Sequence, residues 1–262
     1  MVKLFYGKGV EGVITSIKFE NKLTMVAQMS NDSKFQVLEF DELKGGADVD
    51  TVSARDIMNR SGMRLRQVRI ILEDSSVKIQ QGALSYMKGS INPKSSGNKA
   101  INFGKKFLNS KLGNETQIDK IAYEGNGEIF LEPSFGYFVL IELEDEEIIV
   151  EDGLFFACED VIEVKSFTNG LKYETCFSGS GIVVLELPVP EKEVFKCKLY
   201  KDTLKTDGDF AVLRGKNIVH SIEGEGNINV YSGIGDVWIL PTKEIYEDLK
   251  IEKTNSLYEE EN

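Results

Sequence analysis

The sequence predicts an all-β protein, built as a pseudo-threefold repeat of β-roll or β-sandwich units that resembles a double-stranded β-helix. A Gly-x-Gly phrase occurs at Gly125–Gly127, Gly179–Gly181 and Gly233–Gly235, with 54 residues between successive copies. Each phrase opens an apolar stretch that ends at a proline. A fixed period of this length is typical of repeated supersecondary units that share one core.

A second recurring phrase, a dipeptide that ends in glycine, predicts hairpin turns. It occurs at Asp152-Gly153 and Asp207-Gly208, with an earlier copy at Gln81-Gly82, and short apolar stretches flank each copy. Asp-Gly favours a two-residue turn in which both central residues have positive φ. A catalytic pair formed by Asp152 and Asp207 is the alternative, but the turn role explains both residues, and we favour it.

The segment before the repeats, residues 1–65, is predicted to hold one helix and several strands. The helix spans Val52–Gly62, with Ser53 as its N-cap and Gly62 as its C-terminal stop. Alternating apolar residues between polar turns predict the strands, which cover residues 13–19, 23–29 and 35–40.

The repeat domain is predicted over residues 66–242, with one insertion at about 92–112. The insertion starts with the flexible composition Asn-Pro-Lys-Ser-Ser-Gly, and a short amphipathic helix is predicted over 102–112. Insertions of this kind often lie on the functional face of a repeat protein. The acidic tail, 243–262, is predicted to be helical over 243–251 and disordered from 255.

Length and composition place the chain among ordinary globular proteins. A chain of 262 residues buries about 70–75% of its unfolded surface, so it needs no disulfides to be stable. No apolar run approaches the ~18–20 residues that span a bilayer, and we expect no signal peptide. The cysteines, Cys158, Cys176 and Cys197, form no Cys-x-x-Cys pair, which predicts reduced thiols in the cytoplasm.

Charge is distributed unevenly along the chain. The net charge of −12 argues against nonspecific nucleic-acid binding, yet residues 55–111 carry a net charge of +9. This segment predicts either weak contact with an anionic membrane or acidic partner through Lys105, Lys106 and Lys111, or pairing with the acidic remainder of the molecule. We favour pairing.

No motif predicts catalysis, a cofactor or a metal. The glycine phrases precede strands, whereas a dinucleotide fingerprint requires a helix to follow. The single histidine, His220, is expected to be a hydrogen-bonded structural residue, since metal sites need clustered ligands. A Cys–His pair is disfavoured because Cys158 and Cys176 lie in apolar stretches, and Trp238 is predicted to lie in the core. We therefore assign no catalytic, cofactor-binding or metal-ligating residue.

The repeats resemble the family named for altered inheritance of mitochondria, also called domain of unknown function 124. The residues that carry the resemblance are Gln81–Gly89, Gly125–Leu131, Gly136–Ala157 and Gly233–Pro241, which includes Val237-Trp238. The resemblance covers roughly residues 68–242. It implies a pseudo-threefold all-β assembly similar to the tryptophan-attenuation-protein-like fold. Its bacterial members have no assigned activity, and its mitochondrial members are linked to inner-membrane organisation. It brings no catalytic residues.

These observations predict a non-enzymatic scaffold or adaptor whose partner is another protein or a second copy of the chain. The alternative is a small-molecule or anion-binding module, in which glycine-rich turns present backbone N–H groups to the ligand. A hydrolase or isomerase that uses scattered carboxylates is a third interpretation, and it requires a cleft with carboxylates of perturbed pKa.

Overall fold

The computed structural model describes residues 23–94, 120–168, 173–224 and 228–248. In these ranges thirteen strands pair into one antiparallel system, together with an α-helix, a short 3-10 helix and a helical stretch at residues 243–248. The all-β prediction is confirmed. The elements are β1 (Leu23–Ser30), β2 (Ser33–Phe40), α1 (Val49–Ser61), β3 (Arg66–Ile79), β4 (Leu84–Pro93), β5 (Ile121–Leu131), β6 (Tyr137–Glu151), β7 (Phe155–Glu159), β8 (Glu163–Thr168), β9 (Tyr173–Leu187), η2 (Glu191–Glu193), β10 (Phe195–Asp207), β11 (Ala211–Gly215), β12 (Ile218–Glu223) and β13 (Ile228–Ile239).

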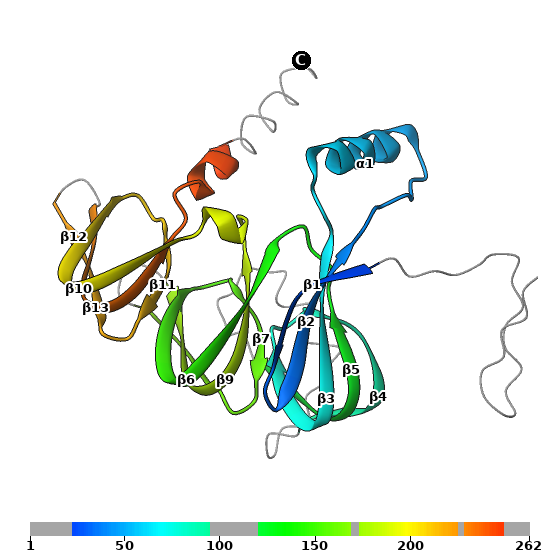
Figure 1. The fold of residues 1–262 in the computed structure, drawn as a ribbon, viewed down its shortest axis with the longest axis horizontal. Coiled ribbons are helices and arrows are strands. Elements are labelled where there is room, and N and C mark those ends of the chain that lie inside the picture. Colours follow the sequence, from blue (N-terminus) through cyan, green and yellow to red (C-terminus); the bar gives the residue numbers. More distant parts are fainter. Residues whose placement is uncertain (1–22, 95–119, 169–172, 225–227, 249–262) are drawn as a thin grey trace, which may run out of the picture.

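The strands form three blocks with the same internal pairing. Block 1 contains β3, β4 and β5; block 2 contains β6 to β9; block 3 contains β10 to β13. In each block the long first strand pairs with the long last strand, which also pairs with the strands between them. The blocks are joined where β7 pairs with the end of β3 and β11 pairs with the end of β6. Figure 1 shows the blocks side by side, with block 1 on the right.

Each long first strand is kinked by a bulge opposite a Gly-x-Gly phrase. The bulge residues Asp74, Asp145 and Lys201 have φ values of 56°, 56° and 60°, and the pairing register shifts at each of them. A bulge bends a strand and increases its twist. The glycine phrases therefore lie inside β5, β9 and β13, whereas the sequence predicted them before the strands. At Gly233 a Cβ would lie 2.1 Å from the carbonyl oxygen of Asn217, so the backbones approach too closely for a side chain.

The predicted hairpin dipeptides do not form hairpins. In the described residues the strands that flank each copy, β3 and β4, β6 and β7, and β10 and β11, pair with other strands and not with each other. Gly82 and Gly153 have φ values of 86° and 88°, whereas their partners Gln81 and Asp152 do not have positive φ. The Ala83 amide donates to the Gln80 carbonyl, which places Gly82 at the third position of a turn. A glycine with φ near +80° at that position is typical of a type II turn. The prediction of primed hairpin turns was therefore wrong at both sites.

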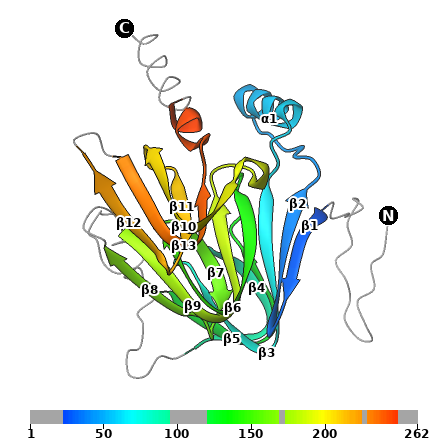
Figure 2. The same ribbon diagram turned by 60° about the vertical axis from the view of Figure 1, so that its left-hand side comes forward.

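The N-terminal strands join the same sheet system. β1 pairs with β2, and β2 pairs with the first half of β3 from Ser33–Leu72 to Glu39–Arg66. The chain then leaves the sheets to form helix α1, which lies at the same end of the molecule as residues 243–248 (Figure 2). The predicted strand over 13–19 and the predicted helix over 102–112 lie outside the described residues.

Helix α1 begins earlier than predicted, because Asp48 and not Ser53 is its N-cap. The Asp48 side chain accepts a hydrogen bond of 2.8 Å from the Thr51 amide, and the carboxylate also favours the positive end of the helix dipole. The predicted stop at Gly62 is confirmed, with a left-handed φ of 78°. The helix buries none of its residues, so it projects from the sheets.

The hydrophobic core lies between successive blocks and becomes smaller along the row. The cluster between blocks 1 and 2 contains seventeen buried residues, the one between blocks 2 and 3 contains ten, and the cluster in block 3 contains five. Each of the first two clusters takes side chains from both of the blocks it joins. No block follows block 3 in the described residues, and these residues therefore cover less of its apolar surface.

Candidate functional site

The joint between blocks 1 and 2 is completed by the N-terminal hairpin. Phe35 and Val37 of β2 are buried in one cluster with Ile70 and Leu72 of β3 and with Val184 of β9. β2 pairs with the first half of β3 while β7 pairs with its second half. The hairpin thus extends one sheet of a β-sandwich and covers apolar surface that block 2 presents.

A buried carboxylate holds this hairpin in place. Glu159 is 1% exposed and accepts hydrogen bonds from the Ser33 amide (2.8 Å), the Asn31 side-chain amide (3.0 Å) and the Ile182 amide (3.0 Å). Three donors compensate for the desolvation of the carboxylate. A Cβ on Gly181 would lie 2.7 Å from Glu159 Oε2, so this glycine leaves the carboxylate its space.

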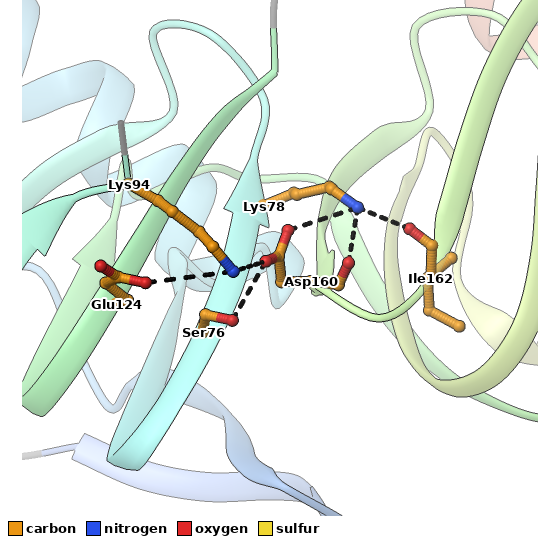
Figure 3. A network of polar contacts seen from close by, with 6 residues as sticks. All are labelled: Ser76, Lys78, Lys94, Glu124, Asp160 and Ile162. Atoms are coloured by element: carbon orange, nitrogen blue, oxygen red, sulfur yellow. Dashed lines mark hydrogen bonds and ion pairs between the residues drawn. The ribbon is translucent and has the colours of Figure 1, made fainter. Parts of the chain in front are cut away.

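The next residue, Asp160, ties block 2 to block 1 (Figure 3). Its carboxylate accepts from Lys94 Nζ at 2.5 Å and Ser76 Oγ at 3.1 Å, and it lies 3.3 Å from Lys78 Nζ. Lys78 also donates to the backbone carbonyls of Asp160 and Ile162, at 2.6 and 2.7 Å. Burial raises the pKa of Asp160, but the Lys94 hydrogen bond and the Lys78 charge outweigh it and lower the pKa below its ordinary value.

In the described part of the chain no hairpin covers the joint between blocks 2 and 3, and a groove of about 530 Å³ lies there. We call it the open groove. Its apolar lining includes the buried Leu143, Ile148 and Leu213 and the half-buried Ile141 and Trp238. Its other lining residues are Asp145, Glu146, Glu147, Ser178, Gly179, Gly215, Lys216, Asn217, Ile234, Gly235 and Asp236.

The open groove occupies the position that β2 fills in the preceding joint. Leu143 pairs with Gly181 as Leu72 pairs with Gly127, and both leucines stand two residues before a bulge. Ile141 and Leu143 therefore correspond to Ile70 and Leu72. Trp238 and Leu213 lie next to each other across β13 and β11, as Val184 and Ala157 do across β9 and β7. Within the described residues, β6 pairs only with β9 over Tyr137–Leu143.

The rim of the open groove is acidic. Four carboxylates, those of Asp145, Glu146, Glu147 and Asp236, face a single lysine, Lys216. Lys216 Nζ lies 2.7 Å from Glu147 Oε2, and this hydrogen bond lowers the pKa of Glu147 and raises that of Lys216. Gly215 stands where the preceding joint has Glu159, because it pairs with Ile148 as Glu159 pairs with Val77. The carboxylate that anchors β2 thus has no counterpart here.

Comparison with known proteins identifies the family. The family model of mitochondrial biogenesis AIM24 matches residues 58–242. The chain belongs to the AIM24 family. A search of curated proteins finds no match. Among solved structures, the AIM24 chain is similar to the crystal structure of protein SPYM3_0169 from Streptococcus pyogenes, with 18% identity and a TM-score of 0.53 over 72% of this chain and 94% of that one. At this identity the similarity concerns the fold alone.

The candidate residues of the sequence analysis lie in different parts of the molecule. His220 Nε2 lies 2.8 Å from Asn229 Oδ1, and the His220 ring stacks on Tyr231. Cys158 is buried in the core of block 2, where burial raises the pKa of its thiol to about 12. Asp152 lies in the turn after β6, and Asp207 is the last residue of β10, in a different block. Trp238 is only half-buried and lines the open groove, so its prediction as a core residue was only partly right.

Four basic residues of the 55–111 segment pair with carboxylates elsewhere in the chain. Arg66 lies 2.9 Å from Glu39, Arg69 lies 2.6 Å from Glu128, and Lys78 and Lys94 contact Asp160. Lys105, Lys106 and Lys111, the predicted membrane contacts, fall outside the described residues. No helix in the described ranges is long and apolar enough to cross a membrane.

Proposed function

We propose that this AIM24 chain is a non-enzymatic adaptor that binds an extended segment of a partner protein in the open groove. The proposal rests on one observation: a strand, β2, covers the equivalent surface in the preceding joint, whereas no described residue covers it here. Strand addition to a free sheet edge is a recurring mode of peptide recognition, in which backbone hydrogen bonds give affinity and pockets for alternate side chains give specificity.

The preceding joint suggests how the segment lies. β2 runs antiparallel to β3, and its residues Phe35 and Val37 are buried between the two blocks. A partner segment in the same orientation pairs with β6 over Tyr137–Leu143 and inserts two alternate apolar side chains. Ile141, Leu143, Leu213 and Trp238 then surround these side chains, as their counterparts surround Phe35 and Val37.

The rim selects the charge of the partner. Four carboxylates against one lysine favour basic residues at the outward-facing positions of the bound strand. The same charges oppose an anionic ligand, so the groove favours the adaptor over an anion-binding module. We place this adaptor in the cytoplasm, because the free thiols of Cys158, Cys176 and Cys197 suit a reducing compartment.

Trp238, the single tryptophan of the chain, allows a direct test. The probe is a synthetic peptide with the β2 sequence in which the residues equivalent to Gln36 and Leu38, on the face opposite Phe35 and Val37, are lysine: Ser-Lys-Phe-Lys-Val-Lys-Glu-Phe. We expect a saturable change in Trp238 emission that weakens as salt is added, because charge contributes to binding. An emission that stays unchanged up to millimolar peptide contradicts the proposal.

A matched pair of variants controls for the site. Asp145→Lys reverses a charge at the groove, whereas Asp74→Lys makes the same change at the equivalent bulge of block 1. Both substitutions are compatible with the fold, since Lys201 occupies the third bulge with the same positive φ. Asp145→Lys is expected to weaken peptide binding several-fold and Asp74→Lys to leave it unchanged. An equal effect of both variants contradicts binding in the groove.

A further inference from the structure

The two ends of the row of blocks carry unpaired strand edges. Within the described residues, β4 pairs only with β5 at the outer edge of block 1, and β10 pairs only with β13 at the outer edge of block 3. Figure 1 shows β4 and β10 at opposite ends of the molecule, so they do not pair with each other in one chain. An unpaired edge presents free N–H and C=O groups that can pair with another chain.

The chain already uses one type of joint twice. We call the second strand of each block (β4, β7 and β11) its middle strand. In both joints the middle strand of one block pairs with the second half of the first strand of the preceding block. Val77 thus lies opposite Glu159, and Ile148 lies opposite Gly215. Val77 and Ile148 each stand three residues after a bulge residue, and in β10 that position is Leu204. β10 therefore has the strand half that would accept a third middle strand, but no described block follows block 3 to supply one.

β4 is the middle strand that has no preceding block. The register of β4, β7 and β11 shifts just before Tyr86, Ala157 and Leu213, so these residues occupy equivalent positions. Ala157 and Leu213 are buried in the cores that they share with the preceding blocks. Tyr86 is instead 52% exposed, and it stacks on Phe130 with ring centroids 4.5 Å apart. This aromatic pair occupies the place of side chains that are buried in the other two joints.

The second half of β10, which would accept a middle strand, matches the edge of β4 in two respects. Its core cluster holds only five buried residues, with Leu204 partly buried against it, which leaves apolar surface for Tyr86 and Phe130 to cover. Lys205 corresponds to Lys78, which donates to the carbonyls of Asp160 and Ile162 across the first joint. The equivalent carbonyls in β4 belong to Gly89 and Ile91, so Lys205, whose Nζ lies 2.5 Å from Glu223 Oε2 within one chain, finds further acceptors on the incoming strand.

We propose that β4 of one copy pairs with β10 of a second copy, so that the chain assembles head to tail through the same kind of joint that connects its own blocks. The contact is heterologous, because two different surfaces meet; such contacts generate rings when the rotation closes and filaments when it does not. The open groove takes no part in this contact, so the assembly and the adaptor function are tested separately.

Cysteine cross-linking tests the register. The pair Lys78–Cys158 in the first joint corresponds to Lys205 of one copy opposite Met87 of the other. Chains that carry Lys205→Cys or Met87→Cys are mixed and oxidised, and we expect a covalent one-to-one dimer that neither chain forms alone. Lys198→Cys, in the first half of β10, is the matched control and should not link to Met87→Cys. Absent cross-linking, or equal linking by Lys198→Cys, overturns the proposal.

Light scattering tests the direction of assembly. The unmodified chain should grow in mass with concentration, whereas Tyr86→Lys and Leu204→Lys should each remain monomeric. A mixture of the two variants should form a dimer and nothing larger, because each partner keeps one intact surface.

Val49→Lys is the control: it changes an exposed residue of α1 and should assemble like the unmodified chain. Thermal unfolding confirms that each variant is folded. A monomeric unmodified chain up to 100 μM (~3 mg/mL), or variants that assemble like it, overturns the proposal.

Discussion

Arg214 of β11 and Glu174 of β9 form an ion pair that is almost completely buried. Nη2 lies 2.8 Å from Oε2, and the two side chains are 8% and 6% exposed. Within the described residues, Nε and Nη1 of Arg214 have no hydrogen-bond partner. The pair links block 3 to block 2 beside the open groove, in the same joint where Lys216 pairs with Glu147.

Removal of one member of this pair should be more damaging than removal of both. Arg214→Met leaves the Glu174 carboxylate buried without its arginine, which costs about 3–5 kcal/mol. Arg214→Met combined with Glu174→Leu replaces both charges by apolar side chains, and we expect it to recover most of that loss. Urea unfolding of the two variants measures the difference. An Arg214→Met protein with the unfolding midpoint of the unmodified chain contradicts this account.

The Asp160 network should make stability depend on pH below about pH 5. The pKa of Asp160 is lower in the folded protein than its ordinary value, which is about 3.9 in an unfolded chain. The ionised carboxylate therefore stabilises the fold fully above that value, and the stabilisation disappears as pH falls through the folded pKa.

Asp160→Asn isolates this contribution. The difference in unfolding free energy between the unmodified chain and the variant should be constant from pH 7 to about pH 5 and should then decrease toward pH 3. Asp74→Asn is the control, since Asp74 is an exposed aspartate on the same strand, β3. A difference that grows as the pH falls would show that Asp160 does not act through its charge.

Gly181 should tolerate alanine less well than Gly153. Both have positive φ, at 152° and 88°, so both substitutions strain the backbone, and each costs at least about 1 kcal/mol. At Gly181 the new Cβ also meets Glu159 Oε2 at 2.7 Å, whereas at Gly153 it meets nothing within 4 Å. Gly181→Ala should therefore lose more stability in thermal unfolding. Faster amide exchange at Ser33 should accompany it, because Glu159 holds that amide.

The regular spacing of the glycine phrases was enough to predict the β architecture. Gly125 and Gly233 are needed because two backbones approach closely opposite a bulge, and Gly179 shares their positive φ at the equivalent position of the strand pairing. Turn type and capping were harder to predict. Asp48 and Ser53 are both acceptable caps in sequence, and only the start of the hydrogen-bonded turn distinguishes them.

The site could be predicted only in part, because it depends on contacts between distant segments. Glu159 resembles a solvated strand residue in sequence, yet it is buried by donors that include Asn31, 128 residues away. One signal was available: a strand pair precedes block 1, but only residues 132–136 separate β5 from β6. That gap leaves no room for a second covering hairpin, and the open groove follows from it.

Cys176 should report the charge at the rim of the open groove. Burial and the nearby Glu147 carboxylate raise the pKa of its thiol to about 11, so little thiolate exists at pH 8 and alkylation is slow. Glu147→Gln removes the negative charge and leaves the nearby Lys216 and Lys165, whose charges lower the pKa of Cys176. We expect iodoacetamide to modify Cys176 several-fold faster in this variant, as measured by peptide mass spectrometry. Glu146→Gln, an exposed neighbour, should leave the rate unchanged. Equal rates in the two variants would mean that burial alone sets the pKa of this thiol.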